Sequence, residues 1–394
     1  MKSDALPPLT DKEQSYVSVL CDVITQRISE NNGMISFHDF MNMALYTPGL
    51  GYYATARYNI GEKGDFITAP TFSKLFSQTF AQHFANLLTT LGNDAVIVEF
   101  GAGTGQFACD CLLHLKQLNR LPKAYYIIET SADLAHQQRQ LLQEALPDYY
   151  ANIHWLAQLP TEKLNAVVFA NEVLDAMPVE LFSYESNHFF QTMVACSQDG
   201  FTFTKNASLP ESLHEVLEKL PIKNRQNDMP YNSEVNLWIR PWLQSICRFL
   251  AKGVVYICDY GYHRDLYYSP ERMMGTLSCY YKHHVHYNPL INVGVQDITA
   301  HVDFTEVAEA AEQLGFEIDG FVSQGKFLLA AGIMERYQAL VSQRDNKETL
   351  ALSQQLQKLT LATEFSESFK VMAISLNYDD IIEPFEQFDQ SYLL

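Results

Sequence analysis

Residues 98–105 read Val-Glu-Phe-Gly-Ala-Gly-Thr-Gly, an apolar strand that ends in three alternating glycines, and a helix is predicted from about Phe107. Glycines at a strand-to-helix junction let the backbone adopt positive φ and let a ligand approach the peptide plane closely. We therefore expect Gly101, Gly103 and Gly105 to bind a ligand off the carboxyl end of the strand, rather than to form only a tight turn.

Short apolar runs, separated by helical spans, follow one another through the rest of the chain. Such runs are typical of a parallel sheet that is covered on both faces. They predict a doubly wound α/β domain with strands at 95–100, 124–129, 152–157, 166–171 and 254–259. Near the end of this domain, the runs FEIDGFVS and KFLLAAGI are close enough to pair as an antiparallel hairpin at the sheet edge.

The remaining segments predict a smaller additional domain formed by the N-terminal region and by insertions. We expect an N-terminal helical region with a glycine-rich lid over 1–90, a core over 91–335, and a helical, acidic region over 336–394. Within the core, insertions are predicted near 181–235 and 262–302, and the first of them contains a hairpin.

Composition excludes several classes of protein. Of the 394 residues, 47% are hydrophobic and 19% are charged, as in a folded chain. The formal net charge of −19 repels phosphate backbones and anionic lipids, so a nucleic-acid partner is not expected and a basic or neutral protein surface fits better. The seven scattered cysteines show no disulfide or zinc pattern, and no apolar run is long enough to span a membrane. These features predict a cytoplasmic protein.

Two ligands are compatible with the glycine turn. Residues 103–108 match the G-x-G-x-x-[GA] fingerprint of nicotinamide dinucleotide sites. Glu99, however, would oppose a pyrophosphate, whereas it suits S-adenosylmethionine (SAM), which has a sulfonium, an ammonium and no phosphate. Glu129 at the end of the next strand is predicted to accept hydrogen bonds from both ribose hydroxyls, with a surface acid as the alternative.

Polar side chains end two further strands of the predicted sheet. The fourth strand ends in Asn-Glu-Val-Leu-Asp at residues 171–175, and the fifth ends at Asp259. Because the carboxyl ends of parallel strands form the ligand edge of such sheets, we predict a carboxylate-lined cleft there. We assign Asn171 to the cofactor and Asp259 to the substrate.

A glycine-rich lid is predicted from Tyr46 to Pro70. Its many aromatic residues argue against a flexible connector, because such side chains seek burial or a ligand. Asp65 and Thr68 are predicted to contact the cofactor or the acceptor, with a structural turn as the alternative. Tyr53 could line the acceptor channel, although aromatic pairs usually only pack.

Histidines near residue 300 suggest two kinds of role, metal binding and acid–base chemistry. His283, His284 and His286 lie in one tract, but no Cys or carboxylate spacing completes a tetrahedral site, so no metal is assigned. His301 is expected near the cleft, either as a general base or in a structural hydrogen bond.

Several motifs over about residues 37–305 occur together: FMNMALYTPGLGYY, GEKGDFITAP, VEFGAGTG, NEVLDAMPVE, CDYGY, GTLSCYYKHH and QDITAHVDFT. With them the chain resembles the MidA/NDUFAF7 family of class I SAM-dependent methyltransferases. The glycine motif is shared by many methyltransferases, whereas GDFITAP and DITAHVDF are specific to this family. The resemblance implies a Rossmann-like methyltransferase sheet, an added smaller domain and SAM as donor. For mitochondrial members it implies protein arginine methylation in the assembly of respiratory complex I.

An arginine acceptor would stay charged until it attacks, and its planar fork of donors calls for paired carboxylates. Glu172, with Asp175 or Glu180 as the second member, is predicted to form this pair. The expected partner is a protein substrate, with a respiratory-complex subunit as one candidate, and a homodimer is left open. Two other classes remain as alternatives: an NAD-dependent oxidoreductase, and a non-catalytic assembly factor that keeps the fold.

Overall fold

The computed structural model describes residues 6–55, 68–222, 229–342, 345–361 and 364–394. The chain divides into two compact units. Unit 1 combines Met1–Phe66, Leu174–Ile239 and His263–Asp303, and unit 2 combines Ile67–Val173, Arg240–Tyr262 and Phe304–Leu394. The chain thus leaves unit 2 at the two places where the sequence predicts insertions.

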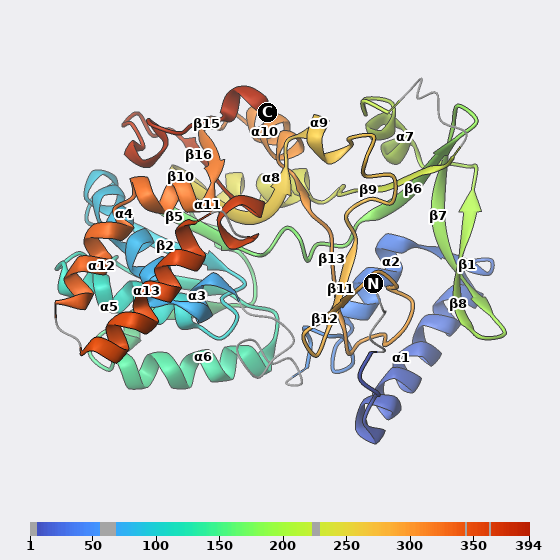
Figure 1. The fold of residues 1–394 in the computed structure, drawn as a ribbon, viewed down its shortest axis with the longest axis horizontal. Coiled ribbons are helices and arrows are strands. Elements are labelled where there is room, and N and C mark those ends of the chain that lie inside the picture. The colour runs from blue at the N-terminus through green and yellow to red at the C-terminus, as the bar shows by residue number, and fades with distance from the viewer. Residues whose placement is uncertain (1–5, 56–67, 223–228, 343–344, 362–363) are drawn as a thin grey trace. The chain divides into compact units, whose positions relative to one another are not determined.

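Unit 2 is built on a sheet with the strand order β15-β16-β10-β5-β2-β3-β4. Figure 1 labels the first five of these strands. Its parallel strands are β2 (Val96–Phe100), β3 (Tyr125–Ile128), β4 (Ile153–Leu156), β5 (Leu164–Asn171) and β10 (Leu250–Tyr262). Because β2 has β3 on one side and β5 on the other, the strand order reverses at β2, and ligands bind at such a reversal. The predicted fold class is confirmed.

The antiparallel edge of this sheet differs from the predicted hairpin. β15 (Glu317–Ser323) pairs with β16 (Phe369–Leu376), while the run KFLLAAGI lies mostly in helix α11 (Gln324–Ala330). A short apolar run fits a buried helix as well as a buried strand, and here Phe327 and Leu328 of the helix are fully buried in the core. The missing strand, β16, lies in the C-terminal region 336–394, which was predicted to be helical and acidic.

Helices complete the core of unit 2. They are α3 (Ala69–Phe72), α4 (Lys74–Leu91), α5 (Gln106–Gln117), α6 (Ala132–Ala145), α8 (Ile239–Phe249), α10 (Phe304–Gln313), α11, α12 (Ile333–Val341) and α13 (Asn346–Thr360), with short turns η1 (Tyr150–Asn152), η2 (Glu364–Ser368), η3 (Glu383–Phe385) and η4 (Ser391–Leu393). The apolar face of α4, with Phe76, Phe80 and Phe84, is fully buried. Phe107 of α5 stacks on Phe169 of β5 with ring centroids 4.0 Å apart. Both α4 and the C-terminal helices therefore belong to unit 2, across the predicted region boundaries.

Among the described residues, no helix is long and apolar enough to cross a membrane.

Unit 1 contains smaller antiparallel sheets with the orders β1-β7-β6-β9, with β8 beside β7, and β12-β11-β13. Its strands are β1 (Met34–Ser36), β6 (Glu180–Glu185), β7 (His188–Ser197), β8 (Gly200–Asn206), β9 (Tyr231–Val235), β11 (Ser278–Tyr281), β12 (His284–His286), β13 (Asp297–Thr299) and β14 (Val302–Asp303). Its helices are α1 (Asp11–Glu30), α2 (Phe37–Tyr46), α7 (Glu211–Leu217) and α9 (Arg264–Tyr267). Because β1 pairs with β7, the N-terminal region and the first insertion share one sheet.

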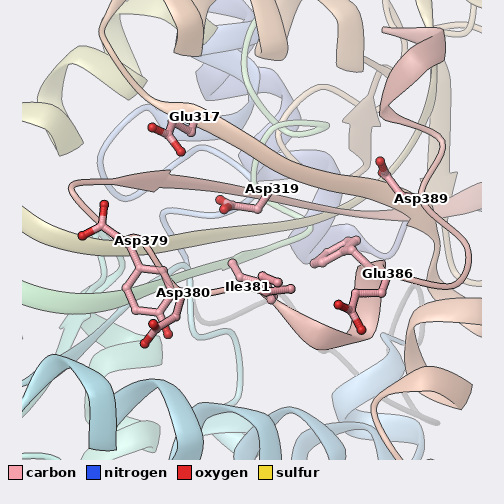
Figure 2. Close-up of a pocket in the computed structure, with 10 residues that line it drawn as sticks. Glu317, Asp319, Asp379, Asp380, Ile381, Glu386 and Asp389 are labelled. Atoms are coloured by element: carbon pink, nitrogen blue, oxygen red, sulfur yellow. The ribbon is translucent and has the colours of Figure 1, made fainter.

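A pocket of about 500 Å³ opens beside β15 in unit 2 (Figure 2). Its lining includes the carboxyl groups of Glu317, Asp319, Asp379, Asp380, Glu386 and Asp389. In the sheet, Glu317 of β15 lies opposite Ser375 of β16, and Ser375 lies opposite Val254, near the start of β10. The pocket therefore lies at the amino ends of the parallel strands, whereas the glycine turn follows a carboxyl end.

Candidate functional site

The glycine turn joins β2 to α5 at the predicted ligand edge of unit 2. Gly101, Gly103 and Gly105 have φ angles of 62°, 53° and 81°, in the left-handed region that favours glycine. A Cβ on Gly105 would lie 3.1 Å from Cγ of Gln138, and one on Gly101 would lie 3.4 Å from Cγ2 of Val173. The positive φ angles thus account for the three glycines, and a turn without side chains fits close approach by an extended ligand.

Glu129 follows β3 and brings a carboxylate to the same edge. Its Oε1 accepts a hydrogen bond from the Ser131 backbone N–H at 2.9 Å, and its Oε2 accepts one from the Gln138 side-chain amide at 3.0 Å. Burial raises the pKa of Glu129, and these hydrogen bonds oppose the rise. Since each carboxylate oxygen has a second acceptor position, Glu129 can still accept from ribose hydroxyls, and this contact stays a prediction.

Glu99 lies within β2 and is 3% exposed. The hydroxyl of Tyr125 donates a hydrogen bond to its Oε2 at 2.8 Å. Burial raises the pKa of Glu99 to about 8, so the carboxyl group is largely neutral at pH 7. The reason for predicting a cofactor contact was a negative charge that faces a cation. The charge of Glu99 at pH 7 is therefore weaker than the prediction assumed, and its contact with the cofactor stays a prediction.

The end of β5 carries a strained residue. Glu172 has a φ of 52°, which is uncommon for a residue other than glycine and is frequent at functional sites. The amide of Asn171 donates to Oε1 of Glu172 at 3.0 Å, and the N–H of Glu172 donates to the carbonyl of Cys258 at 2.9 Å. Oδ1 of Asn171 is buried and accepts no hydrogen bond from the residues that the structure describes. An unmatched acceptor at this edge fits a ligand that brings a donor, such as the ammonium of SAM.

Asp259, near the end of β10, is fully buried. Its Oδ2 accepts a hydrogen bond from the N–H of Val173 at 3.2 Å, and its Oδ1 accepts one from the N–H of Tyr260 at 3.0 Å. The carboxylate thus holds the backbone where the chain leaves β5. This structural role fits its burial better than the predicted contact with substrate.

Asp175 and Glu180, the predicted partners of Glu172, belong to unit 1. Asp175 is 5% exposed, and its backbone carbonyl accepts a hydrogen bond from the N–H of Ala300 at 3.0 Å. Glu180 begins β6, and its Oε2 accepts from the amide of Gln191 at 2.9 Å, while burial raises its pKa. Each residue thus has contacts within unit 1, and the carboxylate pair stays a prediction.

Segments that are distant in sequence meet within unit 1. The hydroxyl of Tyr46 donates to the carbonyl of Ala176, and the hydroxyl of Tyr53 donates to Oδ1 of Asp297, both at 2.9 Å. The two tyrosine rings stack with their centroids 5.6 Å apart. These contacts join parts of the motifs YTPGLGYY, LDAMP and DITAHVD. Tyr53 therefore holds the motifs together, and its place in an acceptor channel stays a prediction.

A buried carboxyl group organises the chain around His301. Oε1 of Glu234 accepts from the hydroxyl of Tyr267 at 2.8 Å, and from the N–H and hydroxyl of Thr276 at 2.8 and 2.6 Å. The same two hydroxyls bond the carbonyl and the N–H of His301 at 3.1 and 2.9 Å. Burial lowers the pKa of His301 to about 4, and the positive charge of Arg272 adds to this effect. The imidazole is therefore neutral at pH 7, so both predicted roles remain open.

The remaining predictions concern Thr68, Asp65 and the histidine tract. Thr68 is the N-cap of α3, and its N–H donates to the hydroxyl of Thr71 at 3.2 Å, which fits the structural alternative for this segment. Asp65 lies outside the described residues. His284 and His286 belong to β12, and no group of three His, Cys, Asp or Glu that could hold a metal occurs in the described part of the chain.

Two buried polar residues were not predicted from the sequence. Gln138 is 0% exposed and Glu234 is 1% exposed. Gln138 lies on the buried stripe of α6, which otherwise consists of Leu134, Ala135 and Leu142. A single polar residue on an apolar helical stripe is a signal that could have identified it. Glu234 lies in the polar segment NSE and gives no comparable signal.

The glycine turn and the strand ends fall within a segment that matches a known family. Residues 79–322 match the family described as "Putative S-adenosyl-L-methionine-dependent methyltransferase". The chain belongs to this family. Its cofactor is SAM, which is one of the two ligands compatible with the glycine turn and the one that the resemblance implies, and the NAD-dependent alternative is not favoured.

Two crystal structures from Burkholderia thailandensis are similar to the whole chain. One is bound to S-adenosyl-homocysteine, is 32% identical and has a TM-score of 0.91, covering 99% of this chain and 100% of that one. The other, a native structure, is 33% identical with a TM-score of 0.90 and the same coverage. S-adenosyl-homocysteine (SAH) is the product that SAM leaves after methyl transfer, so the first structure agrees with SAM as the cofactor.

Curated relatives support the predicted family and correct one prediction. The Drosophila melanogaster protein arginine methyltransferase NDUFAF7 homolog, mitochondrial, is 25% identical over 93% of this chain and 87% of the relative. Human protein arginine methyltransferase NDUFAF7, mitochondrial, is 24% identical over 83% of this chain and 76% of the relative. Because these relatives are named as mitochondrial proteins, the predicted cytoplasmic location is contradicted.

Proposed function

We propose that the protein transfers a methyl group from SAM to a guanidinium nitrogen of an arginine in a protein. Relatives named as protein arginine methyltransferases support this acceptor. The observation that carries the proposal is the strained Glu172, which directly follows the parallel strand beside β2. A backbone strain of about 1–3 kcal/mol persists where the surrounding structure requires it, often at a functional site.

In this proposal, residues of unit 2 bind the methyl donor and pair with the acceptor. Bound SAM supplies a methyl group on a sulfonium, which the acceptor nitrogen takes by in-line displacement, leaving SAH. Glu129, Asn171 and the backbone of the glycine turn would hold the donor at the sheet edge. Glu172 would pair with the guanidinium, localise its electron density on one nitrogen and accept the proton that this nitrogen releases. Asp175 or Glu180 is the proposed second carboxylate.

The charge of the chain supports a basic protein as the acceptor. A formal net charge of −19 attracts a positively charged surface and repels nucleic acids and anionic lipids. A subunit of a respiratory complex is the candidate that the family resemblance implies. A homodimer remains part of this proposal and is tested by the mass of the purified protein in solution.

The acceptor can be identified by labelling. The purified protein is incubated with SAM that carries an isotopically labelled methyl group and with a lysate of its own cells, and the labelled products are sequenced by mass spectrometry. We expect the label on an arginine side chain of a protein. A label on lysine, on a carboxylate or on a small molecule would contradict the arginine acceptor. A Gly105→Val variant is the control, because a side chain at this position would collide with Gln138.

A further inference from the structure

Gln138 lies between the two parts of the cofactor edge, the glycine turn and the carboxylate of Glu129. It belongs to α6 and is fully buried. Burying an amide costs free energy unless its polar atoms form hydrogen bonds, so the partners of Gln138 indicate what the residue does. Every contact described below lies within unit 2.

The orientation of the Gln138 amide follows from its contact with Trp155. The indole Nε1 of Trp155 lies 2.8 Å from Oε1 of Gln138, and an indole N–H can only donate. The atom that faces it must therefore be the amide oxygen, which places the amide nitrogen on the opposite side. Arg139 lies over the Trp155 ring, 4.8 Å from its centroid, and helps to hold the indole in place.

The amide nitrogen then links the two parts of the cofactor edge. Nε2 of Gln138 donates one hydrogen bond to the carbonyl of Gly103 at 2.8 Å and another to Oε2 of Glu129 at 3.0 Å. Both hydrogens of the amide are used. The side chain also lies directly behind Gly105, where a Cβ would come within 3.1 Å of its Cγ. One residue thus fixes the glycine turn and the carboxylate in a single arrangement.

We propose that Gln138 is a positioning residue for the cofactor, which orients Glu129 toward the ribose and fixes its distance from the glycine turn. The proposal rests on the proposed role of Glu129 as the acceptor for the ribose hydroxyls. A carboxylate that is held in one orientation accepts from a pair of adjacent hydroxyls better than a mobile one, since less order is lost on binding. Gln138 therefore contributes to selection of a ligand that carries both ribose hydroxyls.

Binding of two ligands to matched variants tests this role. Dissociation constants are measured by calorimetry for SAH and for an SAH analogue that lacks both ribose hydroxyls, using the full-length protein and its Gln138→Met, Gln138→Glu and Glu129→Gln variants. Methionine has a similar length to glutamine but forms no such hydrogen bonds. We expect Gln138→Met to bind SAH about 10-fold more weakly while its affinity for the analogue changes about 2-fold or less, so that selectivity falls.

The Gln138→Glu variant separates positioning from packing. Glutamate keeps the shape and the acceptor for Trp155, but it has no donor for Gly103 and would place a second carboxylate beside Glu129. Positioning predicts that SAH binds to Gln138→Glu at least as weakly as to Gln138→Met, because the carboxylates repel each other. A packing role predicts the reverse order, since the glutamate variant preserves the volume, and that order would overturn the proposal.

The outcomes distinguish the proposal from its premises. If Gln138→Met weakens both ligands equally while Glu129→Gln loses selectivity, Glu129 contacts the ribose but Gln138 does not position it. If Glu129→Gln keeps the selectivity, the role of Glu129 is wrong and the proposal fails with it. If the unmodified protein does not bind SAH, the assignment of the cofactor edge itself fails.

A Trp155→Phe variant keeps an aromatic ring near Arg139 but removes the donor that orients the Gln138 amide. We expect its loss of affinity for SAH to be about a third of the loss in Gln138→Met.

Discussion

The two edges of the unit 2 sheet are both rich in carboxyl groups, but the surroundings of these groups differ. At the carboxyl ends of the parallel strands, Glu129 accepts hydrogen bonds from the backbone N–H of Ser131 and from the side-chain amide of Gln138. At the opposite edge, Asp319 is one of the residues that line the pocket in Figure 2. Its Oδ1 accepts a hydrogen bond from the hydroxyl of Ser375 at 3.1 Å, whereas its buried Oδ2 has no hydrogen bond within the described residues. The number of acids therefore does not identify a site. Hydrogen-bond donors that hold a carboxylate in place, next to backbone that a ligand can approach, indicate a binding site better than the number of acids does.

The largest expected difference between the edges concerns Glu172. Changing Glu172 to Gln removes the charge that would pair with a guanidinium, so we expect methyl transfer to fall by about 100-fold or more. The affinity for SAH should change by no more than about 3-fold, because the residue is not assigned to the donor. Initial rates with labelled SAM and calorimetry with SAH measure the two effects.

The control for this experiment is Glu386→Gln, in the pocket at the opposite edge. Glu386 is an exposed carboxylate, and its change should leave both the rate and SAH binding as they are. A Glu172→Gln variant that methylates at the normal rate would remove the proposed carboxylate pair from the mechanism.

The next effect concerns the glycine turn. Gly105 has a φ of 81° and a Cβ there would lie 3.1 Å from Cγ of Gln138, so Gly105→Ala should disturb both the turn and its neighbour. We expect SAH to bind about 10-fold more weakly, which corresponds to about 1.4 kcal/mol. Calorimetry with SAH gives the result.

Gly315→Ala is the matched control, because Gly315 has a similar φ of 85° and no atom within 4 Å of a built Cβ. Both variants should be less stable to heat, whereas only Gly105→Ala should bind SAH more weakly. Equal SAH affinity in the two variants would mean that the ligand does not approach the turn.

The sequence predicts those parts of the fold that depend on neighbours along the chain. The central strands are short apolar runs, and the glycine turn is a local motif, so both can be recognised in one sequence. The edge strand β16 could not be placed, because its pairing with β15 depends on contacts across the intervening helices α11, α12 and α13. The same limit explains why the run around Phe327 was predicted as a strand, since only its packing distinguishes the two structures.

The candidate site shows a second limit, which concerns charge and orientation. A sequence reveals that Glu99 and Glu129 are acids near a glycine turn, but not which of them is protonated. Burial raises the pKa of Glu99 to about 8 although Tyr125 donates a hydrogen bond to it, whereas Glu129 has several donors that favour its charged form. The role of Gln138 likewise depends on Trp155, which approaches it only in the folded protein.

A pH-dependent effect is expected at the opposite edge. Burial, with a smaller contribution from the charge of Glu317, raises the pKa of Asp319 from its ordinary value of 3.8 to about 7. The folded state therefore keeps a proton that the unfolded state releases, so this contribution to stability is full below pH 3.8 and is lost as the pH rises through 7. Asp319→Asn carries no such dependence. Relative to the unmodified protein, its Tm should rise by about 2–4 °C between pH 5 and pH 8.

Thermal unfolding at several pH values tests this expectation. Asp379→Asn, which removes an exposed carboxylate from the same pocket, is the control and should shift Tm by a similar amount at every pH in this range. If the difference in Tm between Asp319→Asn and the unmodified protein does not change with pH, Asp319 is charged over this whole pH range. That is the behaviour expected of a carboxylate that accepts several hydrogen bonds.

The smallest expected effect belongs to Glu99, an acid at the carboxyl edge whose pKa, like that of Asp319, is raised mainly by burial. Glutamine replaces a neutral carboxyl group with a neutral amide whose oxygen can still accept the Tyr125 hydroxyl, so Glu99→Gln should change the affinity for SAM at pH 7 by about 3-fold or less. Glu129→Gln is the matched comparison, because it alters a carboxylate at the end of the adjacent strand and should weaken binding by about 10-fold. Calorimetry with SAM separates the two cases. If Glu99→Gln lowers the affinity for SAM by about 10-fold or more, Glu99 is charged in the folded protein and attracts the sulfonium or the ammonium. Burial within a strand would then not be enough to exclude an acid from a binding site.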